Sequence, residues 1–129
     1  VEVTLKAHSI WTGVEALDKL LRSADFFDAD RFPAITFRSA SVRKTGERTG
    51  EVEGELTIMG QSRPVVLQVT WNYTGEHPLA KLNPSYRDRI VSGFSATTKV
   101  TRSDWGLKRG TPLISDEIWI TIETEVFAK

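Results

Sequence analysis

Apolar and polar residues alternate along most of this chain, and a period of two is typical of β-strands with one buried and one solvated face. In the segment 51–59, Val52, Leu56 and Ile58 alternate with three glutamates and a threonine. Charges at every second position must face water, so this strand is half buried. The same alternation predicts six strands, at residues 1–5, 35–42, 51–59, 64–73, 93–100 and 116–127.

The connections between these strands indicate how they pair. Short stretches rich in turn residues join the second strand to the third, at 44–50, and the third to the fourth, at 59–64. A parallel crossover needs a dozen residues or more, so the neighbours must be antiparallel. The chain therefore predicts a mainly β fold built on an antiparallel sheet.

One helical segment interrupts the strands, at residues 12–23. Its apolar residues Val14, Leu17, Leu20 and Leu21 have the spacing of one helix face. Thr12 and Glu15 are three residues apart, which is the arrangement of a capping box, so we expect Thr12 to be the N-cap. The chain thus runs from a strand into a helix and back into a strand.

The apolar sides of six strands need a cover, either a second sheet or the curling of the sheet into a barrel. In the fourth strand we expect that side to carry Val65, Leu67, Val69, Trp71 and Tyr73. The small residues Gly54, Ala96 and Thr98 on the apolar sides favour a hollow or a close approach of strands. Ordinary sandwich packing is the alternative.

The amino-acid composition argues against several classes of function. Lysine plus arginine number 17 and aspartate plus glutamate 17, so the formal net charge is zero and gives no field that would gather nucleic acid. The absence of cysteine excludes disulfides, zinc–thiolate sites and cysteine nucleophiles. No stretch approaches the roughly 20 apolar residues of a transmembrane helix. The chain begins at Val1, which we interpret as a trimmed end.

Three aspartates, Asp25, Asp28 and Asp30, surround two phenylalanines before Pro33 and are the first candidates for chemistry. They do not fit a helix-loop-helix calcium loop, because the sixth and twelfth positions from Asp25 or Asp28 are not the required glycine and glutamate. We interpret them as the solvated side of a turn whose phenylalanines point inward. Pro33 should then start the strand at Ala34.

The histidines, the serines and the cluster around Arg102 do not form a recognisable catalytic or metal-binding motif. His8 and His77 have no second histidine or cysteine at ligand spacing, so a structural role at the surface is the prediction for both. No G-x-S-x-G nucleophile motif is present. The cluster Arg102, Ser103 and Asp104 fits either an anion site or, as we favour, a turn held by its own side chains. An apolar interior without catalytic groups points toward binding.

Five segments, in this order and spacing, together resemble the YceI family of bacterial polyisoprenoid-binding proteins. They are HSIWTG, LRSADFFDADRFPAITFRS, VEGELTIMGQSRPVVLQV, GFSATTKVTRSDWGL and ISDEIWITIETE. The resemblance extends over nearly the whole chain and implies one domain, residues 1–129, with a lipocalin-like antiparallel β-barrel. It also implies that the first strands of the barrel lie outside this chain, since six strands are fewer than the roughly eight that close a lipid-sized barrel.

The same resemblance implies a non-catalytic carrier that holds a long-chain isoprenoid or similar amphiphilic lipid, such as a polyprenyl chain, a quinone or a prenyl phosphate. It implies a periplasmic location, with the cytoplasm as the alternative, and it allows a homodimer. We expect no cofactor or metal besides the bound lipid. Two other functions stay open, which are a small hydrolase-like or metal-dependent enzyme using Asp25, Asp28 and Asp30, and a scaffold without a ligand.

The residues expected to contact the lipid are the apolar side chains of the strands together with two phenylalanines that would anchor the helical segment over one end of the barrel. They are Phe26, Phe27, Phe37, Leu56, Ile58, Val65, Leu67, Val69, Trp71, Phe94, Ala96, Val100, Ile118, Ile120 and Ile122. Packing of the core without any ligand contact is the alternative for each of them.

Overall fold

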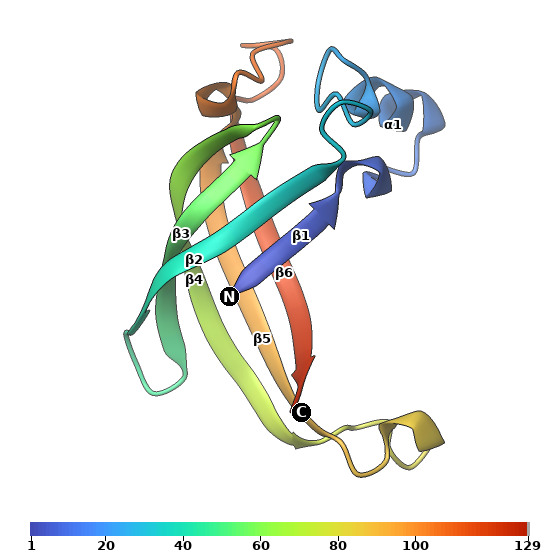
Figure 1. Ribbon diagram of the computed structural model, residues 1–129, viewed down its shortest axis with the longest axis vertical. Helices are drawn as coiled ribbons and strands as arrows, with labels where there is room; N and C mark the ends of the chain where they lie inside the picture. Colours follow the sequence, from blue (N-terminus) through green and yellow to red (C-terminus); the bar gives the residue numbers. More distant parts are fainter. Residues whose placement is uncertain (129) are drawn as a thin grey trace.

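A computed structural model describes residues 1–128, and Lys129, the last residue of the expected domain, lies outside the described part. One six-stranded antiparallel sheet curls into a half-barrel (Figure 1). The strands follow one another in the sheet as in the chain, so β1 and β6 form its edges. Their bounds are β1 Glu2–Lys6, β2 Ala34–Lys44, β3 Thr49–Ile58, β4 Gln61–Glu76, β5 Ile90–Thr101 and β6 Glu117–Phe127. The predicted mainly β, antiparallel fold is confirmed.

Short helices occupy the connections. They are η1 Ala7–Ser9, α1 Glu15–Arg22, η2 Pro84–Tyr86 and η3 Arg102–Trp105. α1 and η3 lie at the same end of the half-barrel, and η2 lies at the opposite end (Figure 1). Among the helices of residues 1–128, none has the length and hydropathy needed to cross a bilayer.

The predicted cap of α1 is wrong. The N-cap is Val14, which makes no side-chain cap hydrogen bond. Gly13, with a φ of +85°, turns the chain between Thr12 and the helix, so Thr12 lies too early to cap it. The N–H and the hydroxyl of Thr12 instead donate to the carboxylate of Asp18, both at 2.6 Å. This contact ties the entry segment to the first turns of α1.

The hydrophobic core lies on the concave face of the sheet. Phe37 of β2 and Val100 of β5 belong to one buried cluster although β3 and β4 lie between their strands in the sheet. Such side chains meet only where the sheet curls toward them, so the apolar face is the concave one. The cluster consists of Phe37, Val52, Leu56, Ile58, Val65, Val100, Trp105 and Leu107.

Gly54 lets the curl be tight at β3. A Cβ atom on Gly54 would lie 2.4 Å from the carbonyl oxygen of Arg38 and 2.6 Å from Cζ of Phe37. The aromatic ring of Phe37 therefore occupies the space that a side chain at position 54 would need. The small residues on the apolar sides were expected to mark either a hollow or a close approach of strands. At Gly54 they mark a close approach.

A bulge at Asn72 corrects the predicted face of Tyr73. Trp71 pairs with Phe94, but Tyr73 pairs with the next residue along, Gly93, so one residue of β4 is inserted without a partner. An inserted residue reverses the alternation of side chains that follow it. Trp71 therefore stays on the concave face, whereas Tyr73 lies on the convex face.

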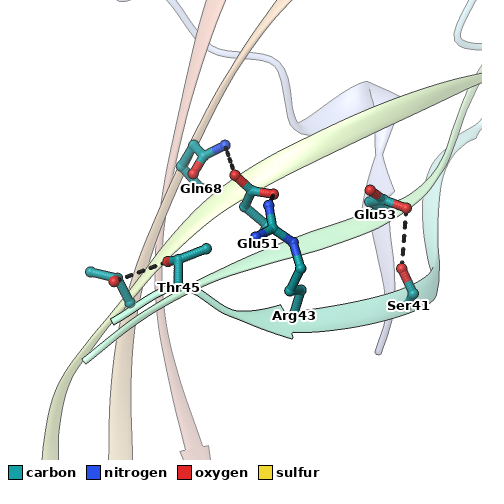
Figure 2. Close-up of polar contacts among 7 residues, drawn as sticks. Ser41, Arg43, Thr45, Glu51, Glu53 and Gln68 are labelled. Atoms are coloured by element: carbon teal, nitrogen blue, oxygen red, sulfur yellow. Dashed lines mark hydrogen bonds and ion pairs between the residues drawn. The ribbon is translucent and has the colours of Figure 1, made fainter. Parts of the chain in front are cut away.

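The convex face of β2, β3 and β4 is polar, as the alternating glutamates predict. Figure 2 shows the side chains that pair across these strands: Arg43 binds Glu51, Gln68 donates to Glu51 at 3.3 Å, and Ser41 donates to Glu53 at 3.2 Å. Exposed pairs of this kind contribute at most about 1 kcal/mol each. The convex face of these strands is therefore polar and solvated, and the apolar side chains lie on the concave face.

Candidate functional site

The apolar concave face is the candidate site, and the predicted ligand residues on it form two groups that share Val69. One group belongs to the buried cluster or packs directly against it, near the end that carries η3. It contains Phe37, Leu56, Ile58, Val65 and Val100 within the cluster, and Phe27, Leu67, Val69 and Ile120 against it. These side chains fill the core of this structure.

The second group forms an apolar surface that is only partly covered. Cross-strand pairs join Val69 to Ala96 and Ala96 to Ile122, and in the next row Trp71 to Phe94. We call these five residues the inner patch. Trp71 is 38 % exposed, while Phe94 and Ile122 are half buried. Ile118, farther along β6, is also 38 % exposed. Ala96, at the centre of the inner patch, is buried, so the patch is apolar, contiguous over three strands, and accessible through its other four residues.

A row of hydroxyl groups borders the inner patch. The indole N–H of Trp71 donates to Oγ1 of Thr74 at 2.8 Å, and the hydroxyls of Thr74 and Ser92 lie 2.6 Å apart. These bonds fix the ring of Trp71 against the sheet. On β4 and β5 the concave face thus changes from apolar to polar within one row of residues, while Val126 of β6, the partner of Ser92, remains apolar. An apolar surface with a few polar groups at its border suits an amphiphilic molecule.

The segment between α1 and β2 covers one end of the half-barrel. Phe26 is 8 % exposed, and Phe27 packs against the buried cluster. Asp25 pairs with Arg109 of the loop after η3 at 2.7 Å, which joins the two connections at this end. β2 begins at Ala34, directly after Pro33, as predicted. Phe26 and Phe27 thus lie at the end of the half-barrel over which they were expected to anchor the helical segment.

The aspartates of this segment do not form a common site, and their predicted solvation is wrong for one of them. Asp28 is 8 % exposed, because its backbone, at a φ of +45°, turns back under the segment. Its carboxylate lies 3.5 Å from Arg31, whereas Asp30 faces His8 at 3.3 Å. Within residues 1–128, no three side chains of His, Cys, Asp or Glu gather as metal ligands.

His77 is buried, which contradicts the predicted surface position. Its ring stacks on Tyr86 with centroids 3.9 Å apart, and Phe127 lies 6.0 Å away. Its Nδ1 accepts the backbone N–H of Leu79 at 3.0 Å, and its Nε2 lies 3.4 Å from Glu125. The stack closes the loop between β4 and β5 onto the end of β6. His8 is exposed, as predicted.

Arg102 holds the loop after η3, so the interpretation of its cluster as a stapled turn is confirmed for Arg102 and Ser103, whose bonds reach residues 107–116. The exposed Asp104 makes no side-chain hydrogen bond within residues 1–128. The guanidinium of Arg102 is buried and donates to the carbonyls of Leu107, Arg109, Ile114 and Ser115 at 2.6 to 3.0 Å. All of its strong donors are thus used within the protein. An anion would have to displace these bonds.

Ser103 and Asp116 fasten the two ends of the same loop. The hydroxyl and the backbone N–H of Ser103 donate to the carboxylate of Asp116, at 2.5 and 2.9 Å. The hydroxyl bond is the main cause that lowers the pKa of Asp116 below its usual 3.8, and the nearby cations Arg102 and Lys108 lower this pKa further. The carboxylate is a structural acceptor and has no histidine partner.

Two core residues were missed in the sequence. Trp105 is 2 % exposed and Leu107 is 6 % exposed, and both belong to the buried cluster. They come from the short helix η3 and the loop after it, where neither a period of two nor a period of 3.6 marks an inward side chain. The only signal was the presence of apolar residues beside Gly106, whose φ of +83° allows the tight turn between them.

Comparison with known proteins identifies the family of this chain. The family model for the YceI-like domain matches residues 1–126. A UPF0312 protein of Pseudomonas putida strain W619 is 36 % identical over 108 residues, which are 84 % of this chain and 52 % of that protein. A UPF0312 protein of Pseudomonas fluorescens strain SBW25 is 34 % identical over the same shares. The chain spans about half the length of the curated relatives that it matches.

Solved structures agree with this match. The YceI protein of Campylobacter jejuni has a TM-score of 0.86 and 30 % identity, covering 99 % of this chain and 71 % of that protein. BcnA of Burkholderia cenocepacia, at a TM-score of 0.81 and 23 % identity, covers 97 % of this chain and 72 % of that protein, and shows the shared fold. These likenesses support a barrel-type fold for the whole protein. The chain belongs to the YceI family.

Proposed function

We propose that this protein is a non-catalytic carrier that binds the hydrocarbon chain of an isoprenoid or similar amphiphilic lipid on its concave face. The observation that carries this proposal is the inner patch, Val69, Trp71, Phe94, Ala96 and Ile122, which is apolar and yet only partly covered. A protein gains stability by covering such a surface. The hydroxyl row at its border would face the polar end of the lipid.

The affinity would come from removing hydrocarbon from water. An isoprenoid chain offers no charge and few hydrogen bonds, so each five-carbon unit contributes a few kcal/mol at about 0.8 kcal/mol per buried methylene group. Ordering a flexible chain opposes part of this gain. Affinity should therefore rise with tail length, by about tenfold or more for one additional unit that still contacts the patch.

Two measurements test the proposal. Organic extraction of the native protein followed by mass spectrometry should detect a bound prenyl lipid. Titration with farnesol and with the longer geranylgeraniol should change the tryptophan fluorescence of the protein through Trp71, with a smaller change in Trp71→Phe, and geranylgeraniol should bind more tightly. The proposal is wrong if no lipid is extracted and neither alcohol changes the fluorescence or the melting temperature.

A matched pair of variants locates the site. Ile122 and Thr121 are neighbours on β6 whose side chains lie on opposite faces of the sheet. Ile122→Asp should weaken binding of both alcohols by about a hundredfold, because it places a charge on the apolar patch, while Thr121→Asp should leave it within twofold. Equal effects of the two variants would count against the concave face. Trp71→Ala provides a second, uncharged test of the same patch.

The family membership also leads us to propose a periplasmic location and a homodimer for the whole protein. Fractionation of cells that produce the native protein would test the first, and light scattering at several protein concentrations the second. An enzyme using Asp25, Asp28 and Asp30 is not favoured, because these three carboxylates have separate partners, Arg109, Arg31 and His8.

A further inference from the structure

The strands β4 and β5 separate at one end of the sheet. Their pairing runs from Glu76 and Ile90 to Gln68 and Thr97. Beyond this point, residues 61–67 of β4 pair with β3, and residues 98–101 of β5 pair with β6. Pro64 has no N–H to donate, so β4 has one hydrogen-bond donor fewer along this stretch. η3 then turns the chain away directly after Thr101 (Figure 1).

The separation opens a cleft of about 670 Å³ between the two strands. Trp105, buried in the core cluster, lies at its inner side. Val66 of β4 and Trp119 of β6 line it from the convex face, and they are 40 % and 73 % exposed. An indole as exposed as that of Trp119 contributes little to the core. It presents a flat apolar surface beside an open cleft.

The polar groups of the cleft carry both signs of charge. Nζ of Lys99 lies 3.0 Å from Glu117 and 5.6 Å from the ring centroid of Trp119. The carboxylates of Glu53 and Asp104 line the same cleft, as do the side chains of Gln68 and Thr101. Hydrogen-bond donors and acceptors therefore surround an indole within one open concavity.

This combination selects a class of ligand. The carboxylates of Glu53 and Asp104 would repel an anion such as a phosphate. The ammonium of Lys99 offers it little compensation, because it is already paired with Glu117. The many polar groups disfavour a plain hydrocarbon, because they would lose water without gaining hydrogen bonds. A neutral saccharide ring fits both conditions, since its hydroxyls donate to carboxylates and accept from Lys99 while its C–H face lies flat on an indole. We propose that this cleft binds a neutral saccharide, with Trp119 as the stacking platform.

The cleft is distinct from the inner patch. Lys99 and Trp119 pair across β5 and β6 with their side chains on the convex face, whereas Ile120 and Ile122 of the same strand lie on the concave face. Trp71 of the inner patch lies on β4 beyond the point where the strands join. The cleft reaches Val65, Val100 and Trp105 of the buried cluster at its inner side, but none of the five residues of the inner patch lines it, so each proposal can fail alone.

The four tryptophans of the chain, Trp11, Trp71, Trp105 and Trp119, are natural reporters. Their indole N–H signals can be assigned in a nitrogen–proton NMR spectrum by replacing each with phenylalanine. Maltotriose, cellotriose and chitotriose, titrated across the millimolar range, are the probes. We expect at least one of them to shift the indole signal of Trp119 in a saturable way and to leave that of Trp71 unchanged. A shift at Trp71 alone, or no saturable shift at Trp119 with any trisaccharide, would overturn the proposal.

Variants on one face of β6 provide the control. Trp119→Ala should weaken trisaccharide binding about tenfold or more, followed through the backbone signals of Val66 and Thr101, and Trp119→Phe should weaken it less. Thr121→Ala, two residues along the same face, should leave it within twofold. Ile122→Asp should weaken binding of the prenyl alcohols by about a hundredfold and retain saccharide binding. If Trp119→Ala binds the trisaccharides as wild type does, the cleft is not the site.

Discussion

The indole N–H of Trp105 donates a hydrogen bond of 3.0 Å to the backbone carbonyl of Leu56, which lies 49 residues earlier in the chain. This bond joins the short helix η3 to β3, two residues before the end of that strand, inside the buried cluster. It helps to explain why a residue of a short connecting helix is among the least exposed of the protein, at 2 %. The end of the half-barrel that carries η3 is thus a packed core.

Replacing Trp105 should therefore be costly. Trp105→Phe keeps most of the apolar volume but loses the hydrogen bond, and we expect a loss of about 1–2 kcal/mol in the free energy of unfolding. Trp105→Ala also leaves a cavity and should cost about 3–5 kcal/mol. Urea denaturation measures both. Trp119→Phe, at an exposed indole, is the control and should change stability by less than about 0.5 kcal/mol.

Arg102 should be required for the order of the loop between η3 and β6. Arg102→Met retains much of the side-chain volume but leaves the carbonyls of Leu107, Arg109 and Ile114 without their charged donor. We expect a loss of roughly 2–4 kcal/mol in unfolding free energy. Hydrogen exchange should accelerate at the N–H of Leu107, which donates to the backbone carbonyl of Arg102. Lys108→Met, in the same loop, should have neither effect.

Two glycines of the sheet should respond in opposite ways to the same substitution. Gly54→Ala places a methyl group against the carbonyl of Arg38 and the ring of Phe37, so we expect a loss of about 2–4 kcal/mol. At Gly93 a Cβ atom meets no heavy atom within 4 Å. Gly93→Ala should then be neutral or stabilise the fold by up to about 1 kcal/mol. Similar losses at both positions would show that the curl of β3 does not depend on Gly54.

The regular part of the fold could be predicted because each strand of a curled sheet has one dry face. Val52, Leu56 and Ile58 alternate with glutamates, and this period alone places them on the concave side. Short connections then require antiparallel neighbours. The start of β2 at Ala34 follows from the backbone restrictions of Pro33. These features depend on local residues and short spacings, so a single sequence carries them.

Features that depend on tertiary contacts were not predictable. The bulge at Asn72 inserts one residue into an otherwise regular alternation, and nothing in that alternation marks it. His77 is buried because Tyr86, of the same connection, and Phe127, distant in the chain, stack beside it. The separation of β4 from β5 is likewise a matter of strand pairing that no local pattern marks. Of the residues that line the cleft between these strands, Val65 and Val100 were expected to bind a ligand, whereas Lys99 and Trp119 were not.

The contact between Ser103 and Asp116 should make stability depend on acidic pH in a defined direction. The hydrogen bond from the Ser103 hydroxyl lowers the pKa of Asp116 in the folded protein below its usual value of 3.8. A group whose pKa is lowered by folding stabilises the protein above its unfolded pKa, and this contribution is lost as the pH falls through the folded pKa. Ser103→Ala should thus be less stable than wild type at neutral pH, and the difference should shrink below pH 3.8.

NMR titration of the Asp116 carboxyl carbon and urea denaturation at a series of pH values test this prediction together. In Ser103→Ala the pKa of Asp116 should rise toward 3.8, although the bond from the backbone N–H at 2.9 Å is retained. Ser62→Ala is the control, because the hydroxyl of Ser62 bonds to Thr57 at 2.7 Å and not to a carboxylate. Any stability change in that variant should be independent of pH. A stability difference for Ser103→Ala that stays constant down to pH values below 3.8 would show that the hydroxyl acts only through packing, and that the carboxylate of Asp116 is not the group it stabilises.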